Sequence, residues 1–246
     1  LEFSGGQNDI RVLAGHSSTS GGVPYRDMGG FEITGDINAA GQTVELVSDG
    51  AGADGNDIVQ TSGVITANRL QGASAGDLLF NSANGVGQLG SLIAGGDIRY
   101  RGAGSFTLQD NVTAGGGLML NSDTGSIQQF GGAITAAAFS GSAAQGITLT
   151  RVNDVDTLGA IDSGAGDFNF RDVDSIDLGG LVTSGSAVML QAGGDITQSS
   201  GLIVTGALSL FANGRIDPGG PGNDIGSLAA GFAGTDFRFV DVTDFS

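Results

Sequence analysis

Short triplets with apolar outer positions recur along the whole chain and give the first indication of its fold. Phe31-Glu32-Ile33 and Phe106-Thr107-Leu108 are two examples. This alternation is typical of a very short strand that turns two side chains into a core. No longer stretch carries the period of an amphipathic helix between capping residues. We therefore expect an all-β chain with negligible helix.

The triplets recur at a regular spacing. Two runs at 20-residue intervals are Leu78, Ile98, Leu118 and Phe168, Val188, Leu208. Coils of about 20 to 23 residues with three short strands each predict a right-handed parallel β-helix, a solenoid whose coils stack about 4.8 Å apart. The expected inward ladders include Ile58, Ile65, Leu78, Ile98, Leu118, Ile127, Ile134, Ile147, Phe168, Val188, Ile196 and Leu208.

A longer repeat of 69 residues is superimposed on these coils. Its equivalent positions include Ile58, Ile127 and Ile196, then Gln60, Gln129 and Gln198, then Gly63, Gly132 and Gly201. One unit then spans about three coils, and the whole chain forms roughly eleven or twelve coils. We expect the three glutamines to be stacked or corner amides that satisfy backbone groups, rather than ligands of a bound molecule.

We predict one solenoid over residues 1–246, with no linker that divides it. The segment 18–30, which contains Pro24 and Tyr25, is expected to leave the rod as a loop. Both ends of the sequence still carry strand-like triplets. We therefore expect a segment of a longer rod or fibre, or alternatively a rod whose ends meet other copies end to end.

Composition and charge restrict the possible partners. The chain has 47 Gly, no Cys and a formal net charge of −17. Glycine at this frequency supplies many turns. The acidic surface repels nucleic acid and anionic lipid, and we expect neither as a partner. The lack of Cys excludes disulfides and thiolate metal sites, and no apolar run is long enough to predict a membrane span.

The runs Val182–Ile196, Gly194–Gly201 and Leu208–Ile216 resemble the filamentous haemagglutinin family of large bacterial exoproteins, and the resemblance covers about Phe31 to Ile216. The resemblance implies β-helical fibres at the cell surface or in the extracellular space, with roles in adhesion or biofilm. It implies export through an outer-membrane transporter. It also implies a surface glycan or protein as the partner.

Two glycine-rich corners are similar to the start of a calcium-binding nonapeptide. Gly219–Ile225 matches the pattern G-G-x-G-x-D, and Gly52–Ile58 matches it loosely. Their oxygen-bearing side chains suit a hard cation and give four candidate calcium ligands: Asp224, Asn223, Asp57 and Asp54. Calcium rolls need tandem copies, whereas these are isolated. The alternative is a Gly-Asn-Asp corner that only caps a strand, and no other cofactor is predicted.

Clusters of acids raise the alternative of a carbohydrate-active enzyme. Asp172 and Asp174 lie two residues apart, as paired carboxylates of β-helical hydrolases and lyases would on one strand face. The chain has no Trp to stack on a sugar, so we expect these acids on solvated outward faces. His16 is the one histidine and is expected on the surface of a polar loop, without a nucleophile. We predict no catalytic residue.

The sequence thus favours a non-enzymatic structural or adhesive fibre segment outside a bacterial cell. The alternative is a β-helical polysaccharide hydrolase or lyase that uses Asp pairs. A third possibility, an ice- or surface-binding solenoid, requires regular outward threonine ladders, whereas Thr61, Thr113 and Thr148 are scattered.

Overall fold

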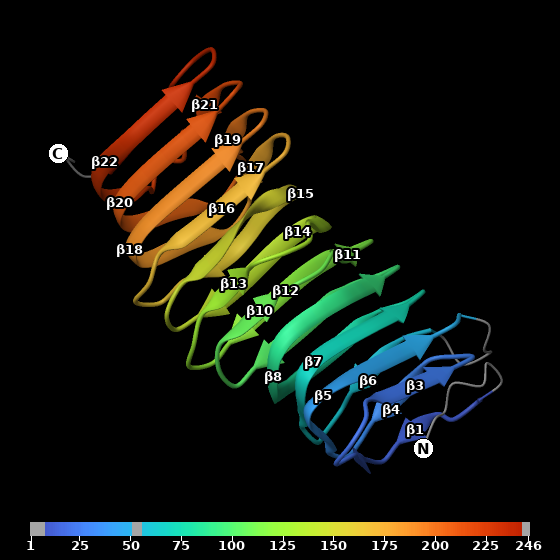
Figure 1. The fold of residues 1–246 in the computed structure, drawn as a ribbon. Coiled ribbons are helices and arrows are strands. Elements are labelled where there is room, and N and C mark those ends of the chain that lie inside the picture. Colours follow the sequence, from blue (N-terminus) through green and yellow to red (C-terminus); the bar gives the residue numbers. More distant parts are fainter. Residues whose placement is uncertain (1–7, 51–55, 243–246) are drawn as a thin grey trace.

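The chain forms an elongated parallel β-solenoid of about 11 turns (Figure 1). The structure is a computed structural model and describes residues 8–50 and 56–242. Every regular element in these residues is a strand, and the 22 strands join in one sheet that winds along the rod. The predicted all-β solenoid is confirmed. No helix in the described ranges has the length and apolarity to cross a membrane.

The strands range from 2 to 17 residues, because some bend around a corner and others stop there. The first eleven are β1 (Val12–Leu13), β2 (His16–Ser17), β3 (Val23–Asp27), β4 (Phe31–Ile33), β5 (Ile37–Ser48), β6 (Ile58–Gln60), β7 (Ile65–Ser74), β8 (Leu78–Ala94), β9 (Ile98–Gly102), β10 (Phe106–Leu108) and β11 (Val112–Ala114). The others are β12 (Gly117–Ser122), β13 (Ile127–Gln129), β14 (Ile134–Ala143), β15 (Ile147–Asp162), β16 (Phe168–Asp172), β17 (Ile176–Leu178), β18 (Leu181–Ala192), β19 (Ile196–Gln198), β20 (Leu202–Ala212), β21 (Ile216–Asp217) and β22 (Asp224–Ala233).

Neighbouring coils pair in parallel and in register. Leu78 of β8 lies opposite Ile98 of β9, and Ile98 lies opposite Leu118 of β12. The corner before these strands has the same spacing, since the Asp97 amide donates to the Asp77 carboxylate 20 residues earlier at 2.7 Å. In-register pairing places identical faces above one another, so each inward position becomes a ladder along the rod.

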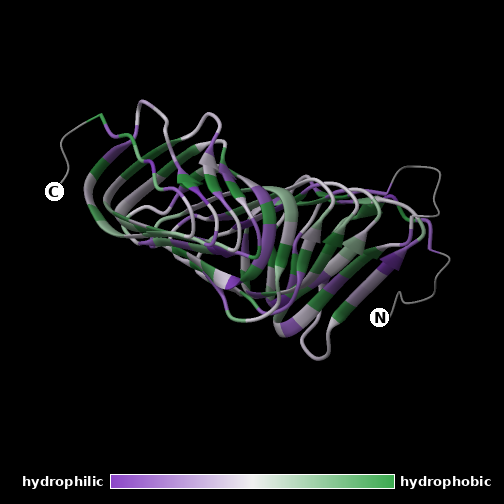
Figure 2. Ribbon diagram, turned by 90° about the horizontal axis from the view of Figure 1, so that it is seen from above, coloured by the Kyte–Doolittle hydropathy of each residue, from purple (hydrophilic) through white to green (hydrophobic). Residues whose placement is uncertain are grey.

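The inward ladders form one continuous apolar core. All twelve residues predicted to face inward are between 0 and 2% exposed. Figure 2 shows apolar and polar positions alternating along the strands. Because successive side chains of a strand point to opposite faces, this alternation divides each coil into a buried and a solvated face.

The prediction of a loop over residues 18–30 is wrong in its central part. Val23–Asp27 forms β3, which pairs with β5, and Tyr25 is only 2% exposed. The Tyr25 ring packs edge-on against Phe31 at 4.6 Å between ring centres. Pro24 fits here because β3 has a single partner strand within the described residues, so the missing N–H does not break a second ladder.

A pair of buried or partly buried amide side chains, here called an amide clasp, closes one corner of each repeat unit. In the central unit Gln129 Nε2 donates to the Gly132 carbonyl at 3.2 Å and to Asn153 Oδ1 at 2.8 Å. The backbone N–H of Ile134 donates to the same Asn153 oxygen at 3.0 Å. The predicted role of the glutamines as corner amides that satisfy backbone groups is confirmed.

The other two units repeat this arrangement. The second partner is an asparagine of the next coil, 24 or 25 residues after the glutamine. The three clasps are Gln60–Asn84, Gln129–Asn153 and Gln198–Asn223. Each asparagine follows a strand corner, so the clasp ties two successive coils together.

Candidate functional site

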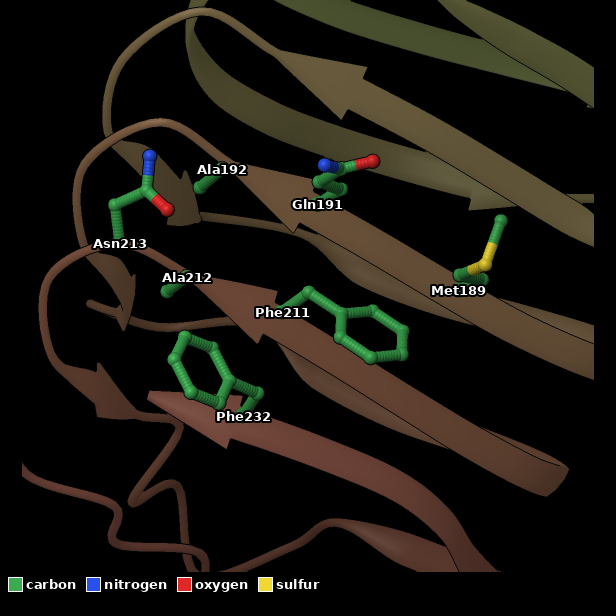
Figure 3. A pocket seen from close by; sticks show the side chains of 7 residues that line it. All are labelled: Met189, Gln191, Ala192, Phe211, Ala212, Asn213 and Phe232. Carbon is green, nitrogen blue, oxygen red and sulfur yellow. The ribbon is translucent and has the colours of Figure 1, made fainter. Parts of the chain in front are cut away.

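A shallow groove on the outer face, near the carboxyl end of the rod, carries the most distinctive chemistry of the surface. Its volume is about 320 Å³. It is lined by Met189, Gln191, Ala192, Phe211, Ala212, Asn213 and Phe232 (Figure 3). We call it the aromatic groove, because the rings of Phe211 and Phe232 lie on neighbouring strands and form its floor.

Strand register sets the positions of these side chains. Gln191 of β18, Phe211 of β20 and Phe232 of β22 are Cα partners on three successive coils. Ala192 and Ala212, the residues next to Gln191 and Phe211 in the two strands, are buried. Gln191 and Phe211 therefore point outward. Phe232 is 61% exposed, an unusual environment for so large an apolar side chain.

The groove has no charge of its own. All seven lining residues are uncharged, although the chain carries a net charge of −17. Within the described part of the chain, the side-chain amides of Gln191 and Asn213 make no hydrogen bond to the protein. Each amide offers donors and an acceptor to a ligand. Two rings flanked by two unused amides can therefore bind a molecule with one apolar face and hydroxyl groups at its edges.

Two larger surface depressions lack this combination. One, of about 430 Å³, lies near the amino end around Phe31 and is bordered by Arg11, Glu32 and Asp57. The other, of about 370 Å³, crosses β12, β14, β15 and β18 and has no aromatic residue in its lining. Neither presents exposed rings in register.

The two calcium candidates within residues 219–225, Asn223 and Asp224, have different environments in the structure. Asn223 is fully buried and forms the third amide clasp, where its Oδ1 accepts from Gln198 Nε2 and from the Ile203 N–H, both at 2.9 Å. Asp224 begins β22 and is exposed. The two side chains therefore point to opposite faces of the coil wall.

Asp57, the third calcium candidate, lies toward the amino end of the rod. Asp57 precedes β6, and its Oδ1 accepts from the Asp77 N–H at 2.8 Å. Asp54 lies outside the described residues. Over residues 8–50 and 56–242, no three acidic or histidine side chains group closely enough to hold a metal ion.

The acidic pair does not lie on one solvated face as expected. Asp172 is 2% exposed and accepts backbone N–H groups of Val155 at 3.0 Å and of Asp174 at 3.1 Å, whereas Asp174 itself is exposed. Burial raises the pKa of Asp172 to about 7, against the effect of these two donors. The expectation of a solvated carboxylate is wrong here because the sheet turns into a corner after β16, where an inward acid caps free N–H groups.

Two more aspartates have the same capping role. The Ile10 N–H donates to Asp27 at 2.8 Å, and the Ile225 N–H donates to Asp241 at 3.0 Å. The sequence contained a signal for this shared role, because Asp172 and Asp241 lie 69 residues apart, which is the length of one repeat unit. Asp154 and Asp156, by contrast, are exposed.

His16 lies in a strand rather than in the expected loop. It belongs to β2, where it pairs with Ile37 and is half-buried, and its N–H donates to the Asp36 carbonyl at 2.8 Å. A two-residue strand has too few positions to show alternation, which explains why the pattern did not reveal it.

The aromatic groove was also not anticipated. Phe211 appears in the sequence directly after an inward leucine, and Phe232 follows Gly231. The 21-residue interval between them was the available signal, since it equals one coil plus the single-residue register shift between β20 and β22. Without the register, neither phenylalanine could be assigned to the outer face.

Comparison with known proteins supports the repeat architecture. Residues 165–230 match a family described as repeats of unknown function (DUF5649). The matched segment contains β16 to β21 and most of the aromatic groove. No curated protein and no solved structure matches the chain. The chain is thus a repeat protein with a parallel β-solenoid fold.

Proposed function

We propose that this solenoid is a non-enzymatic structural and adhesive segment of an extracellular bacterial fibre. The observation that carries the proposal is the uninterrupted ladder: 22 strands join in one parallel sheet with a single apolar core along the rod. A solenoid of this kind adds length by adding units, because each coil contacts only its neighbours. Such a scaffold presents a long outer surface without a buried reaction chamber.

The acidic pair favours this function over the alternative of a polysaccharide hydrolase or lyase. A glycosidase places two carboxyl groups on either side of one sugar linkage. Asp172 is buried and bound to backbone N–H groups of the corner, so its carboxyl group does not reach a polymer on the outer face. Only Asp174 of the pair is exposed.

The resemblance to filamentous haemagglutinin supports a cell-surface location. The runs that show it best, between residues 182 and 216, belong to β18, β19, β20 and β21 and lie inside the segment that matches the repeat family. Export through an outer-membrane transporter is part of the proposal. So is attachment to a glycan or protein on another surface.

Antibody labelling of the producing cells tests the location. We expect gold-labelled antibody to bind intact cells as well as permeabilised ones. Labelling that requires permeabilisation would contradict an extracellular fibre.

A second assay separates the structural function from the enzymatic alternative. The purified protein is incubated with neutral and acidic polysaccharides, and chain length is followed by gel filtration. We expect no cleavage. Cleavage that is lost in Asp174→Asn but kept in Asp156→Asn would favour the enzyme, because both carboxylates are exposed and only Asp174 belongs to the pair.

A further inference from the structure

We infer that the aromatic groove binds a neutral oligosaccharide of pyranose rings. This inference deepens the proposed adhesive function and rests on it. The groove combines the exposed ring of Phe232, the partly exposed ring of Phe211, two unused amides and an uncharged lining on an otherwise acidic protein. Each of these features selects a property of the ligand.

The two rings select a ligand with flat apolar faces. Phe211 and Phe232 are Cα partners on adjacent strands, so their attachment points lie about 4.8 Å apart along the rod. A pyranose ring presents C–H groups on one face, and these carry the slight positive charge that the negative face of an aromatic ring attracts. Two phenylalanines in register offer two successive sugar rings one platform each.

The amides select hydroxyl groups. Gln191 lies on the coil before Phe211, and Asn213 lies two residues after Phe211, at the corner beyond β20. A side-chain amide both donates and accepts, as does a hydroxyl group, so an amide at each border can bind the edges of a sugar chain that rests on the rings. Figure 3 shows both amides bordering the aromatic floor.

Charge selects a neutral chain over an acidic one. The protein has 26 acidic and 9 basic residues, so a polyanion is repelled over most of the surface. No lysine, arginine or histidine lines the groove itself. A uronic-acid polymer would therefore lose long-range electrostatic energy without gaining an ion pair in the groove.

Size is consistent with a short stretch of chain. Three residues in register, Gln191, Phe211 and Phe232, span two coil steps, or about 10 Å along the rod. This length accommodates two sugar rings. Phe232, Gln191 and Asn213 are exposed, so the groove faces solvent and a long polysaccharide can pass across it without having its end inserted.

Calorimetric titration of the full chain with cellohexaose, maltohexaose and hexagalacturonate tests the inference. We expect at least one neutral hexasaccharide to bind, and hexagalacturonate to bind more weakly than it. Phe232→Ala should reduce the affinity by at least tenfold. Phe130→Ala is the matched control, because Phe130 is 56% exposed but lies outside the groove, and it should leave the affinity unchanged.

Several outcomes would overturn the inference. The inference fails if neither neutral hexasaccharide binds, or if hexagalacturonate binds more tightly than both. It also fails if Phe232→Ala binds the neutral sugar as tightly as the wild type does, or if Phe130→Ala loses as much affinity as Phe232→Ala. A wild-type dimer that dissociates in Phe232→Ala without sugar binding would assign the groove to self-association. If sugar binding fails while antibody still labels intact cells, the fibre function stands and only the ligand assignment falls.

Discussion

Gln129 and Asn153 exchange two hydrogen bonds in the interior of the solenoid, across two successive coils. Gln129 Nε2 donates to Asn153 Oδ1 at 2.8 Å, and Asn153 Nδ2 donates to Gln129 Oε1 at 3.3 Å. Asn153 Nδ2 also donates to the carbonyls of Leu149 and Arg171. Both side chains are at most 5% exposed. Their polar atoms therefore depend on one another and on the backbone, because water does not reach them.

Replacing Asn153 with Ala should be strongly destabilising. The substitution removes the Asn153 partner of the Gln129 amide and leaves the buried Ile134 N–H without its acceptor, and an unsatisfied buried group costs about 1–3 kcal/mol. We expect the midpoint of urea unfolding to fall clearly. Asn213→Ala is the control, since that amide is exposed, and it should shift the midpoint little. Equal shifts for the two variants would contradict a structural role for the clasp.

Truncation of a ladder residue should also lower the free energy of unfolding. Ile127 is fully buried, and Ile127→Ala should cost about 2–5 kcal/mol through lost burial and a cavity. Ile93, which is 49% exposed, provides a matched comparison. Ile93→Ala should cost less than half as much in the same urea titration. A small effect at Ile127 would mean that neighbouring coils close around the deletion.

Asp172 should make the protein less stable as the pH rises from about 4 to 7. Its pKa is raised from 3.8 to about 7 in the folded protein, so over this range the folded chain retains a proton that the unfolded chain has released. The stability that depends on this retained proton is fully present below pH 3.8 and is lost as the pH rises through about 7. The loss is at most about 1.4 kcal/mol per pH unit, the limit for one proton.

The contribution of Asp172 can be isolated with Asp172→Asn, which cannot ionise. The difference in unfolding free energy between this variant and the wild type should change between pH 4 and pH 7, in favour of the variant at the higher pH. Asp156→Asn, which changes an exposed carboxylate, should show no such trend. A constant difference for Asp172→Asn would show that the folded carboxyl group titrates normally.

Gly132 should not tolerate a side chain. Gly132 comes shortly after the glutamine of an amide clasp and has a φ of +65°. A Cβ added to it would lie 2.1 Å from the backbone carbonyl carbon of Asp110. Gly132→Ala should therefore destabilise the protein by more than about 1 kcal/mol, since both the backbone conformation and the space oppose it. Gly104→Ala meets no atom within 4 Å and should be neutral or slightly stabilising. Thermal unfolding of the two variants distinguishes these outcomes.

The repeat made the architecture predictable from the sequence, because a solenoid places equivalent residues at equivalent heights. Ile58, Ile127 and Ile196 showed the period directly, and all three are buried. The corners were harder to predict. Pro24 suggested a loop, whereas an edge strand tolerates it. Asp172 suggested a solvent-exposed carboxylate, whereas it is buried and accepts hydrogen bonds from backbone N–H groups, which a sequence pattern does not reveal.

The aromatic groove depends on register, which the sequence left undefined at its last coils. Phe211 and Phe232 meet because β20 and β22 shift by one residue between Leu208 and Ser209. A shift of that kind moves side chains between faces. The outer face of a solenoid is therefore predictable in outline, but its local neighbours are not.

The amide clasps also bear on how such a rod changes length during evolution. One clasp occurs in each 69-residue unit, and its asparagine lies in the coil after its glutamine. Unequal crossing-over between copies of the gene segment that share this register would preserve every glutamine–asparagine pair. Loss of the single coil that holds the asparagine would instead leave a buried glutamine without its amide partner, beside aliphatic residues such as Leu108 of the coil before. We therefore expect viable lengths to differ by steps of three coils, about 14 Å each.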